Sequence, residues 1–101
     1  MGNLHKSFNV VIAEDDEDDY LLIAETLKKV ENIGLIHWVK DGEELLGYLD
    51  ACEASNKSQE KKPNLIILDF NMPKKDGREA LEEIKTNPKR KNIPVIVLTT
   101  S

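Results

Sequence analysis

The sequence predicts an α/β domain built on one parallel sheet, with the element order β-α-β-α-β-α-β. Short runs rich in Val, Ile and Leu recur along the chain, as in parallel strands that are covered on both faces. Amphipathic helical patterns separate these runs, and strands that alternate with helices imply right-handed crossovers onto a single sheet. The 101 residues fit one small domain, so we expect residues 1–101 to form a single unit.

Four apolar runs are the expected strands. They are, in chain order, Phe8–Ala13, Leu35–Val39, Asn64–Leu68 and Ile93–Thr99. The second run contains His37 and Trp38 and is more mixed than the others, so we expect it to lie at a sheet edge. Pro94 falls near the start of the fourth run, where a strand tolerates a residue without an N–H.

Three helical patterns lie between these runs. The first follows an acidic segment that suits a helix N-terminus, and its expected apolar face comprises Tyr20, Ile23, Ala24, Leu27 and Val30. The second opens with Asp41 and Glu44, and the third opens with Asp76 and Glu79. This spacing of a cap and an acid satisfies free N–H groups at a helix start.

The second and third helices also have apolar stripes, which identify the faces that they bury. The stripes comprise Leu45, Leu46 and Leu49 in the second helix and Ala80, Leu81 and Ile84 in the third. Pro88 is expected to end the third helix, and the basic stretch Lys85–Lys91 is expected to be solvated. The polar stretch Glu53–Lys62 is expected to form a loop.

Composition excludes several classes of protein. The net charge of −5 argues against a nucleic-acid-binding surface, which is usually basic. The apolar runs are far shorter than the roughly 20 residues that span a bilayer, so we expect no membrane contact. The single cysteine, Cys52, fits a reducing compartment, and the N-terminus lacks the apolar core of a signal peptide. We therefore expect a cytoplasmic protein.

Polar side chains follow three of the expected strands. Glu14 and Asp15 follow the first strand, Asp69 ends the third, and Thr99 ends the fourth. If the first and third strands are neighbours, three carboxylates converge at the carboxyl edge of the sheet, where open α/β sheets bind ligands. A hard cation such as Mg²⁺ relieves repulsion among carboxylates, and a carboxylate beside Mg²⁺ is a plausible phosphoryl acceptor. The hydroxyl of Thr99 could then contact the phosphoryl group.

An acidic segment at a helix start has a simpler explanation, because such charges are commonly solvated. A metal-dependent phosphohydrolase that forms an aspartyl-phosphate is a further alternative. That class places a second acid two residues after the nucleophile, where this chain has Asn71, and Thr or Val where it has Pro73. The two residues make the phosphohydrolase alternative weak.

Three segments resemble the motifs of response-regulator receiver domains. Asp69–Gly77 resembles the phosphorylation loop, Val11–Asp16 resembles the first strand with its acidic pair, and Ile93–Ser101 resembles the fourth strand with its switch threonine. The motifs occur in the family's order and spacing, and the resemblance extends from about Phe8 to Ser101. The stretches at 75–81 and 87–94 look most like single-domain regulators paired with phytochrome-type kinases.

The resemblance implies a role for each site residue. Asp69 would accept a phosphoryl group from a histidine kinase or a phosphotransfer protein, so the chain would be a phosphoacceptor rather than a turnover enzyme. The metal ligands would be Asp15 directly, Glu14 through water, Asp69, and the backbone carbonyl of Asn71. Thr99 would be the switch residue. Pro73 and Gly77 would shape the loop, Gly77 by allowing the chain to turn into the helix.

The resemblance also implies a flavodoxin-like, doubly wound sheet with the strand order 2-1-3-4. The family's fourth helix, its fifth strand with a lysine, and its last helix would be absent, so residues 1–101 would be a receiver without its C-terminal α-β-α portion. An alternative implied by the missing lysine is an inactive fragment or pseudo-receiver that acts only in docking or assembly. An exposed apolar fourth strand predicts a homo-oligomer joined along Val95–Thr99 or through the uncovered sheet face.

Overall fold

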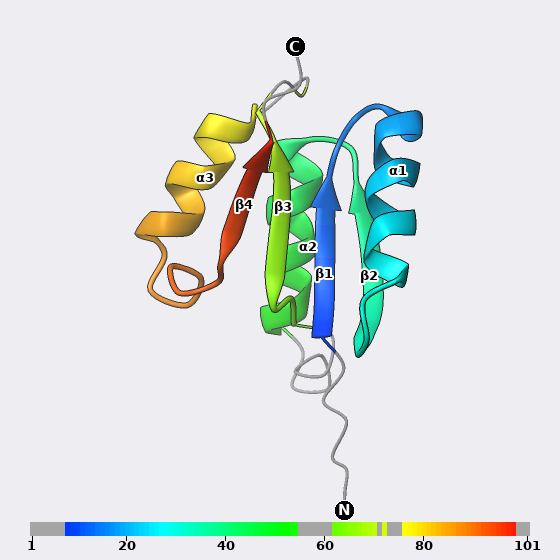
Figure 1. Ribbon diagram of the computed structural model, residues 1–101. Helices are drawn as coiled ribbons and strands as arrows, with labels where there is room; N and C mark the ends of the chain where they lie inside the picture. Colours follow the sequence, from blue (N-terminus) through cyan, green and yellow to red (C-terminus); the bar gives the residue numbers. More distant parts are fainter. Residues whose placement is uncertain (1–7, 55–61, 71, 73–75, 99–101) are drawn as a thin grey trace, which may run out of the picture.

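The computed structural model describes residues 8–54, 62–70, 72 and 76–98. Within them lie the strands β1 (Phe8–Ala13), β2 (Ile33–Val39), β3 (Leu65–Asp69) and β4 (Val95–Leu98), and the helices α1 (Glu17–Lys28), α2 (Gly42–Ala54) and α3 (Gly77–Thr86). All strands pair in parallel, in the order β2-β1-β3-β4 (Figure 1). The predicted element order, strand order and edge position of the second strand are therefore confirmed.

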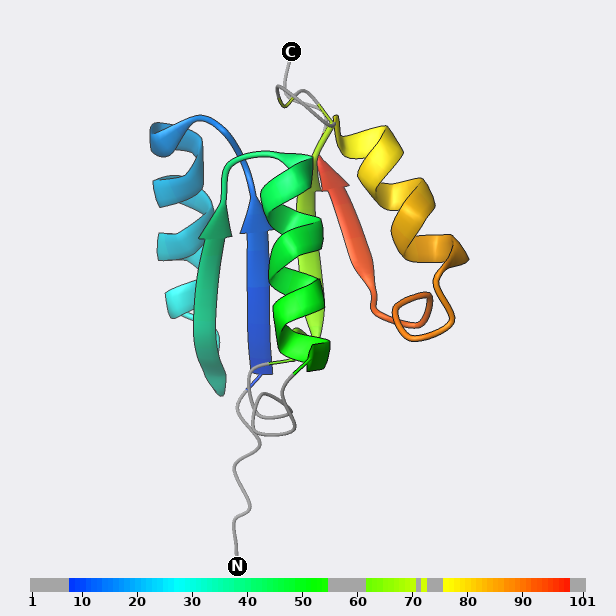
Figure 2. The ribbon, with the colours of Figure 1, turned by 180° about the vertical axis from the view of Figure 1, so that it is seen from behind.

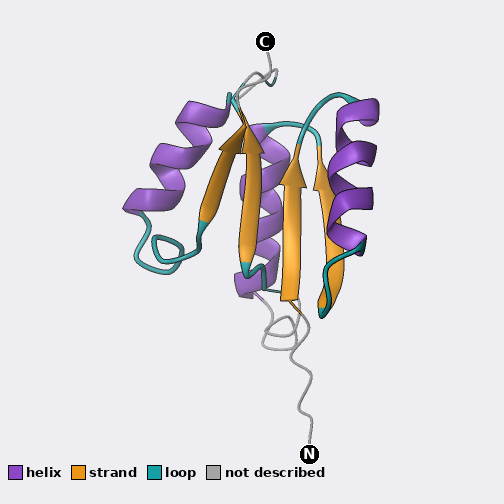
Figure 3. Ribbon diagram, viewed as in Figure 1, coloured by secondary structure: helices purple, strands orange, loops and turns teal. Residues whose placement is uncertain are grey.

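The helices divide between the two faces of the sheet. In Figure 1, α1 lies in front of the sheet near β2, whereas α2 lies behind it, and Figure 2 shows α2 from the other side. Figure 3 shows the resulting three layers of helix, sheet and helix. Apolar side chains of the sheet face that carries α2 and α3 form the larger core cluster, with Leu45, Ile66, Leu68 and Ile84 almost completely buried. The face that carries α1 has the smaller cluster, around Val10, Ile12 and Ile67.

Each helix begins at an aspartate, which the sequence predicts for α2 and α3, whereas for α1 it predicts only an acidic start. Asp16 accepts hydrogen bonds from the N–H groups of Asp18 at 2.8 Å and Asp19 at 3.2 Å, and thereby caps α1. Asp41 accepts from Glu44 N–H at 2.8 Å at the start of α2. Asp76 accepts from the N–H at position 79 at 3.0 Å at the start of α3. These carboxylates satisfy donors that have no partner within the helix.

The first helix is shorter than its apolar pattern predicts. Of the five residues predicted to line its buried face, Tyr20, Ile23, Ala24 and Leu27 do pack in the α1-face cluster. Val30 lies beyond the end of α1 and is 52% exposed, so its assignment to the buried face was wrong. The chain turns after Lys29 toward the left-handed residue Asn32, with a φ of 70°, and this turn carries Val30 away from the sheet.

The basic stretch before β4 is not solvated throughout, because Arg90 is buried to 5% exposure. Its Nε donates to Glu53 Oε2 at 2.6 Å and its Nη2 donates to Glu53 Oε1 at 2.9 Å, and Nη2 also pairs with Asp50. Both acids lie near the C-terminal end of α2. The prediction of a solvated stretch was therefore wrong for Arg90, which ties the loop before β4 to α2.

Replacing Arg90 with Met should lower the free energy of unfolding by about 2 kcal/mol, because hydrogen bonds to charged groups are lost. The pKa of Glu53 lies below its usual value, mainly because Glu53 accepts hydrogen bonds from Arg90. A lowered pKa contributes stability above the ordinary Glu pKa, and this contribution is lost as the pH falls through the lowered value. Urea unfolding should therefore show the difference between the two proteins shrinking at acid pH. Lys91→Met, at an exposed neighbour, should change stability by less than about 0.5 kcal/mol.

Candidate functional site

The site lies at the carboxyl edge of the sheet, between β1 and β3. These strands are neighbours, and Ala13 at the end of β1 pairs with Leu68 in β3. Glu14 follows Ala13, and Asp69 follows Leu68, so the parallel register places the two acids side by side. The crossover from β1 runs outward to β2, whereas β3 continues outward to β4. Winding thus reverses between β1 and β3, which is the point where open α/β sheets bind ligands.

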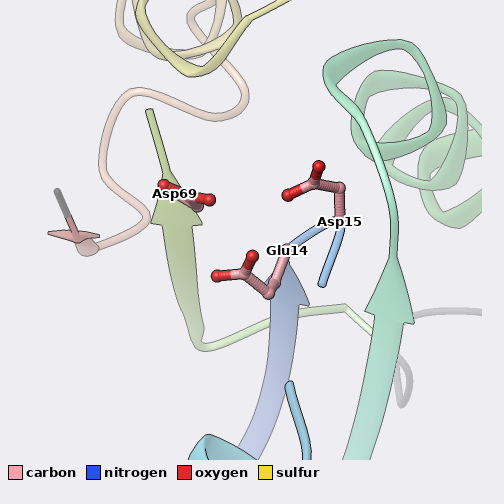
Figure 4. Close-up of side chains that lie close together, drawn as sticks. All are labelled: Glu14, Asp15 and Asp69. Atoms are coloured by element: carbon pink, nitrogen blue, oxygen red, sulfur yellow. The ribbon is translucent and has the colours of Figure 1, made fainter. Parts of the chain in front are cut away.

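Three carboxylates meet at this point. Glu14, Asp15 and Asp69 each offer one carboxylate oxygen, and these oxygens all lie within 4.8 Å of one another. Figure 4 shows Asp69 at the tip of β3, facing Glu14 and Asp15 at the end of β1. Glu14 and Asp69 are each 1% exposed, whereas Asp15 is exposed. The cluster therefore has a buried floor of two acids and one acid that solvent reaches.

Glu14 is held in an environment that opposes its negative charge. One carboxylate oxygen, Oε2, accepts a hydrogen bond from Asp16 N–H at 3.1 Å. The other oxygen, Oε1, is buried and has no hydrogen-bond partner among the described residues. Burial raises the pKa of Glu14 to about 7, the hydrogen bond from Asp16 opposes this rise, and the Asp69 carboxylate adds to it.

This arrangement fits a hard divalent cation. All three donors are carboxylate oxygens. Mg²⁺ and Mn²⁺ prefer such oxygen ligands, whereas Zn²⁺ sites typically use His and Cys side chains. Among the described residues the buried Oε1 of Glu14 has no hydrogen-bond partner, and like charges within 4.8 Å repel, so a cation would relieve both costs. The exposed carboxylate of Asp15 leaves one side open to water and to a phosphate oxygen.

Gly77 gives α3 the room to start against β3. A Cβ at this position would lie 2.4 Å from the backbone oxygen of Asp69 and 2.7 Å from the Cα of Phe70. Such distances are shorter than any real contact of a Cβ, and the atoms that it would meet belong to the backbone. Gly77 does not adopt a positive φ. It is therefore required for close approach to the site, and not for the backbone turn that the sequence suggested.

The remaining predicted site residues are Asn71, Pro73 and Thr99, and they lie outside the described residues. The structure thus brings together Glu14, Asp15 and Asp69 as the sequence predicted. It also places near them Trp38, which the sequence pattern indicates only as part of a mixed edge strand. Trp38 donates its indole N–H to the backbone oxygen of Glu14 at 2.6 Å. Trp38 lies level with the end of β1 only because β1 and β2 pair in this register, so no local pattern in the sequence indicates the contact.

Gly77→Ala should lower the free energy of unfolding by about 1–3 kcal/mol, because the added methyl group meets fixed backbone atoms. Gly47→Ala is the matched control. Gly47 lies exposed in α2, where an added Cβ would meet nothing within 4 Å, so this change should raise stability by up to about 1 kcal/mol through helix propensity. Equal effects of the two substitutions in urea unfolding would contradict the steric role of Gly77.

Glu14→Gln should stabilise the metal-free protein at high pH. A carboxyl group with a raised folded-state pKa costs stability as the pH rises from the ordinary value of 4.5 to about 7, because the folded chain resists ionisation. Above this window the variant should be more stable than the unaltered protein by roughly 1–3 kcal/mol, and below it the two should agree. Urea unfolding with a chelator across this range measures the effect. Glu25→Gln, at an exposed position of α1, should show no such pH dependence.

Within the described residues, no helix has the length and apolar character needed to cross a bilayer.

Comparison with known proteins relates the site to a family. The family model of the response regulator receiver domain matches residues 10–101 of this chain. Response regulator Rcp1 of Synechocystis is 42% identical over 92 residues, which cover 91% of this chain and 61% of that protein. FilR2, a probable methanogenesis regulatory protein of Methanothrix harundinacea, is 36% identical over 94 residues, which cover 93% of this chain and 59% of that protein. The chain therefore spans about three fifths of the length of these relatives.

Solved structures show the same relationship. The phosphorylated cyanobacterial phytochrome response regulator RcpA matches with a TM-score of 0.81 and 41% identity, covering 94% of this chain and 66% of that chain. The Mn²⁺-bound form of Rcp1 matches with a TM-score of 0.79 and 41% identity, covering 93% of this chain and 66% of that chain. The fold, the acidic cluster at the carboxyl edge of the sheet and these matches agree, and this chain belongs to the response regulator receiver domains of two-component signalling.

Proposed function

We propose that the domain accepts a phosphoryl group on Asp69 from a phosphohistidine, with Mg²⁺ held at the carboxylate cluster. The observation that carries this proposal is the convergence of Glu14, Asp15 and Asp69 at the winding reversal of the sheet. Two of the three acids are buried, and one buried oxygen has no hydrogen-bond partner among the described residues. A family member with this geometry has a site suited to a cation and a phosphoryl group together.

The transfer step is a displacement at phosphorus. A carboxylate oxygen of Asp69 forms a bond to the phosphorus atom, and the bond from phosphorus to the histidine nitrogen breaks. The electron pair of that bond remains on the imidazole, which takes up a proton from solvent. Asp69 thereby becomes an acyl phosphate, and its reaction with water returns the free carboxylate and inorganic phosphate. The domain stores the group and does not turn over a substrate of its own.

The other site residues support this step in different ways. Bound Mg²⁺ would neutralise charge on both the carboxylates and the phosphate oxygens. Asp15, on the exposed side, would bind the ion directly, and Glu14 would hold it through water. We also propose that the backbone carbonyl of Asn71 completes the ligand set, that Pro73 shapes the loop, and that Thr99 contacts the phosphoryl group.

The donor of the phosphoryl group would be a histidine kinase or a phosphotransfer protein. Several similar structures are described as phytochrome or bacteriophytochrome response regulators, including RcpA and AtBRR. By analogy with them, we propose a phytochrome-type histidine kinase as the partner of this chain.

Acetyl phosphate should phosphorylate the protein in the presence of Mg²⁺, and mass spectrometry of the intact protein should detect the added group. Asp69→Asn should abolish the labelling, because an amide oxygen is a far weaker nucleophile than a carboxylate oxygen. Asp18→Asn changes an exposed acid in the first turn of α1, outside the cluster, and should leave the labelling unchanged. The absence of both labelling and Mg²⁺-dependent beryllofluoride binding would contradict the proposal and favour a pseudo-receiver that acts in docking.

We propose in addition that the chain self-associates through β4 or through the sheet face that carries α1. In the described part of the chain no strand pairs with the outer edge of β4, and α1 is the only helix on that face (Figure 1). Ile96 is 49% exposed, and its neighbour across the pairing is Ile67 in β3. An apolar strand edge of this kind can pair with a second copy.

Light scattering over a range of concentrations should therefore detect a dimer or a larger assembly. Ile96→Lys should shift the protein to the monomer, because a charge at this position must be desolvated when two copies associate. Leu22→Lys is a suitable control, since Leu22 is 66% exposed on α1 and away from β4. A clean monomer of the unaltered protein at high concentration would contradict the assembly.

A further inference from the structure

The backbone of Glu14 is held by β2 at both of its polar groups. Its N–H donates to the backbone oxygen of Val39 at 3.0 Å, which continues the ladder between β1 and β2. Its carbonyl oxygen accepts from Trp38 Nε1 at 2.6 Å, so a side chain takes the place of the next ladder bond. This carbonyl belongs to the peptide group that joins Glu14 to Asp15, and the indole thus fixes the plane from which Asp15 extends.

The indole is itself held in place on β2. The Tyr20 ring on α1 stacks on it, with 4.3 Å between ring centroids and 3° between ring planes. The Lys40 ammonium group lies 5.0 Å from the centroid of the Trp38 ring. Stacking and cation–π attraction restrict the rotation of the ring. The donor that contacts Glu14 is therefore preorganised and not a mobile surface group.

The three carboxylates of the cluster differ in what holds them. Glu14 and Asp69 are buried, so packing restrains their side chains. Asp15 is exposed, and packing restrains it far less. Its position relative to the other two depends on the peptide group before it, which is the group that Trp38 contacts. A cation that binds through Asp15 would have to order this peptide if the indole did not, and ordering a backbone group costs conformational entropy.

We propose that Trp38 is a positioning residue of the carboxylate cluster, and that its indole N–H holds the Glu14–Asp15 peptide ready for a divalent cation. This role rests on the proposed function in one respect, because it requires that a cation binds between these carboxylates. Trp38 would act on the bound cation only through the Glu14 backbone oxygen that its indole contacts.

Trp38→Phe tests the proposal, because Phe keeps an aromatic ring beside Tyr20 but has no N–H. Isothermal titration calorimetry with Mn²⁺ should show that the variant binds the ion roughly threefold to tenfold more weakly than the unaltered protein, as for one lost hydrogen bond. Leu27→Ala is the control for a general loss of stability. Leu27 packs in the same α1-face cluster, at the opposite end of the helix from the site, and its replacement should leave Mn²⁺ affinity unchanged.

A second measurement uses the unaltered protein, so it does not depend on the folding of a variant. The sequence contains one tryptophan, so its NMR spectrum has a single indole N–H resonance. During a Mg²⁺ titration this resonance should move, and it should saturate at the same ion concentration as the amide resonance of Asp15. Mg²⁺ is diamagnetic, so such a shift reports a change in the hydrogen bond or its surroundings.

The outcomes distinguish a failure of the metal site from a failure of the positioning role of Trp38. If the unaltered protein binds neither Mn²⁺ nor Mg²⁺, the proposed function fails and the role of Trp38 fails with it. If the protein binds Mn²⁺ and Trp38→Phe binds it equally well, only the positioning role is overturned. The same conclusion follows if Leu27→Ala weakens binding as much as Trp38→Phe, or if the indole resonance stays fixed while the Asp15 amide moves.

Discussion

The parallel pairing of β1 with β3 is the constraint on which the site depends. Their register places Ala13 beside Leu68, and the acids that follow these two residues then face each other at the edge of the sheet. A shift of one strand by one residue would move its side chains to the other face of the sheet, and its acid would no longer meet those of the partner strand. The buried apolar residues of β1 and β3 oppose such a shift, since both strands are covered on each face by helices or by neighbouring side chains. Core packing thereby fixes the geometry of a polar site.

That geometry is electrostatically unfavourable until something positive enters it. Glu14 and Asp69 are both almost completely buried, and burial raises the pKa of Glu14 to about 7. Asp16 donates its N–H to Glu14 and caps α1 with its side chain, so one residue links the acidic cluster to the helix. Because the buried carboxylates repel one another without a cation, a bound cation would stabilise the folded chain, and metal binding would thereby be linked to folding.

Long-range contacts hold the elements that carry the site, and they come from residues whose sequence context gives little sign of their role. Arg90 lies in a basic stretch, yet it is buried and reaches Asp50 and Glu53 on α2. Trp38 lies on an edge strand, yet it contacts the backbone beside the carboxylates. Both side chains combine a large apolar surface with a directed donor, and such residues can satisfy a distant acceptor while they are buried.

The sequence by itself determined the order of strands and helices along the chain, the aspartate caps of α2 and α3, and the three acids at strand ends. These features depend on periodicity and on neighbours a few residues apart, and such local patterns are legible in one chain. Only the tertiary structure decided that Arg90 is buried, that Val30 is exposed, and that Gly77 is needed for close approach to Asp69. It also decided that the Trp38 indole meets Glu14, 24 positions away. Partners this far apart are set by how the crossovers pack the chain, and no local pattern records them.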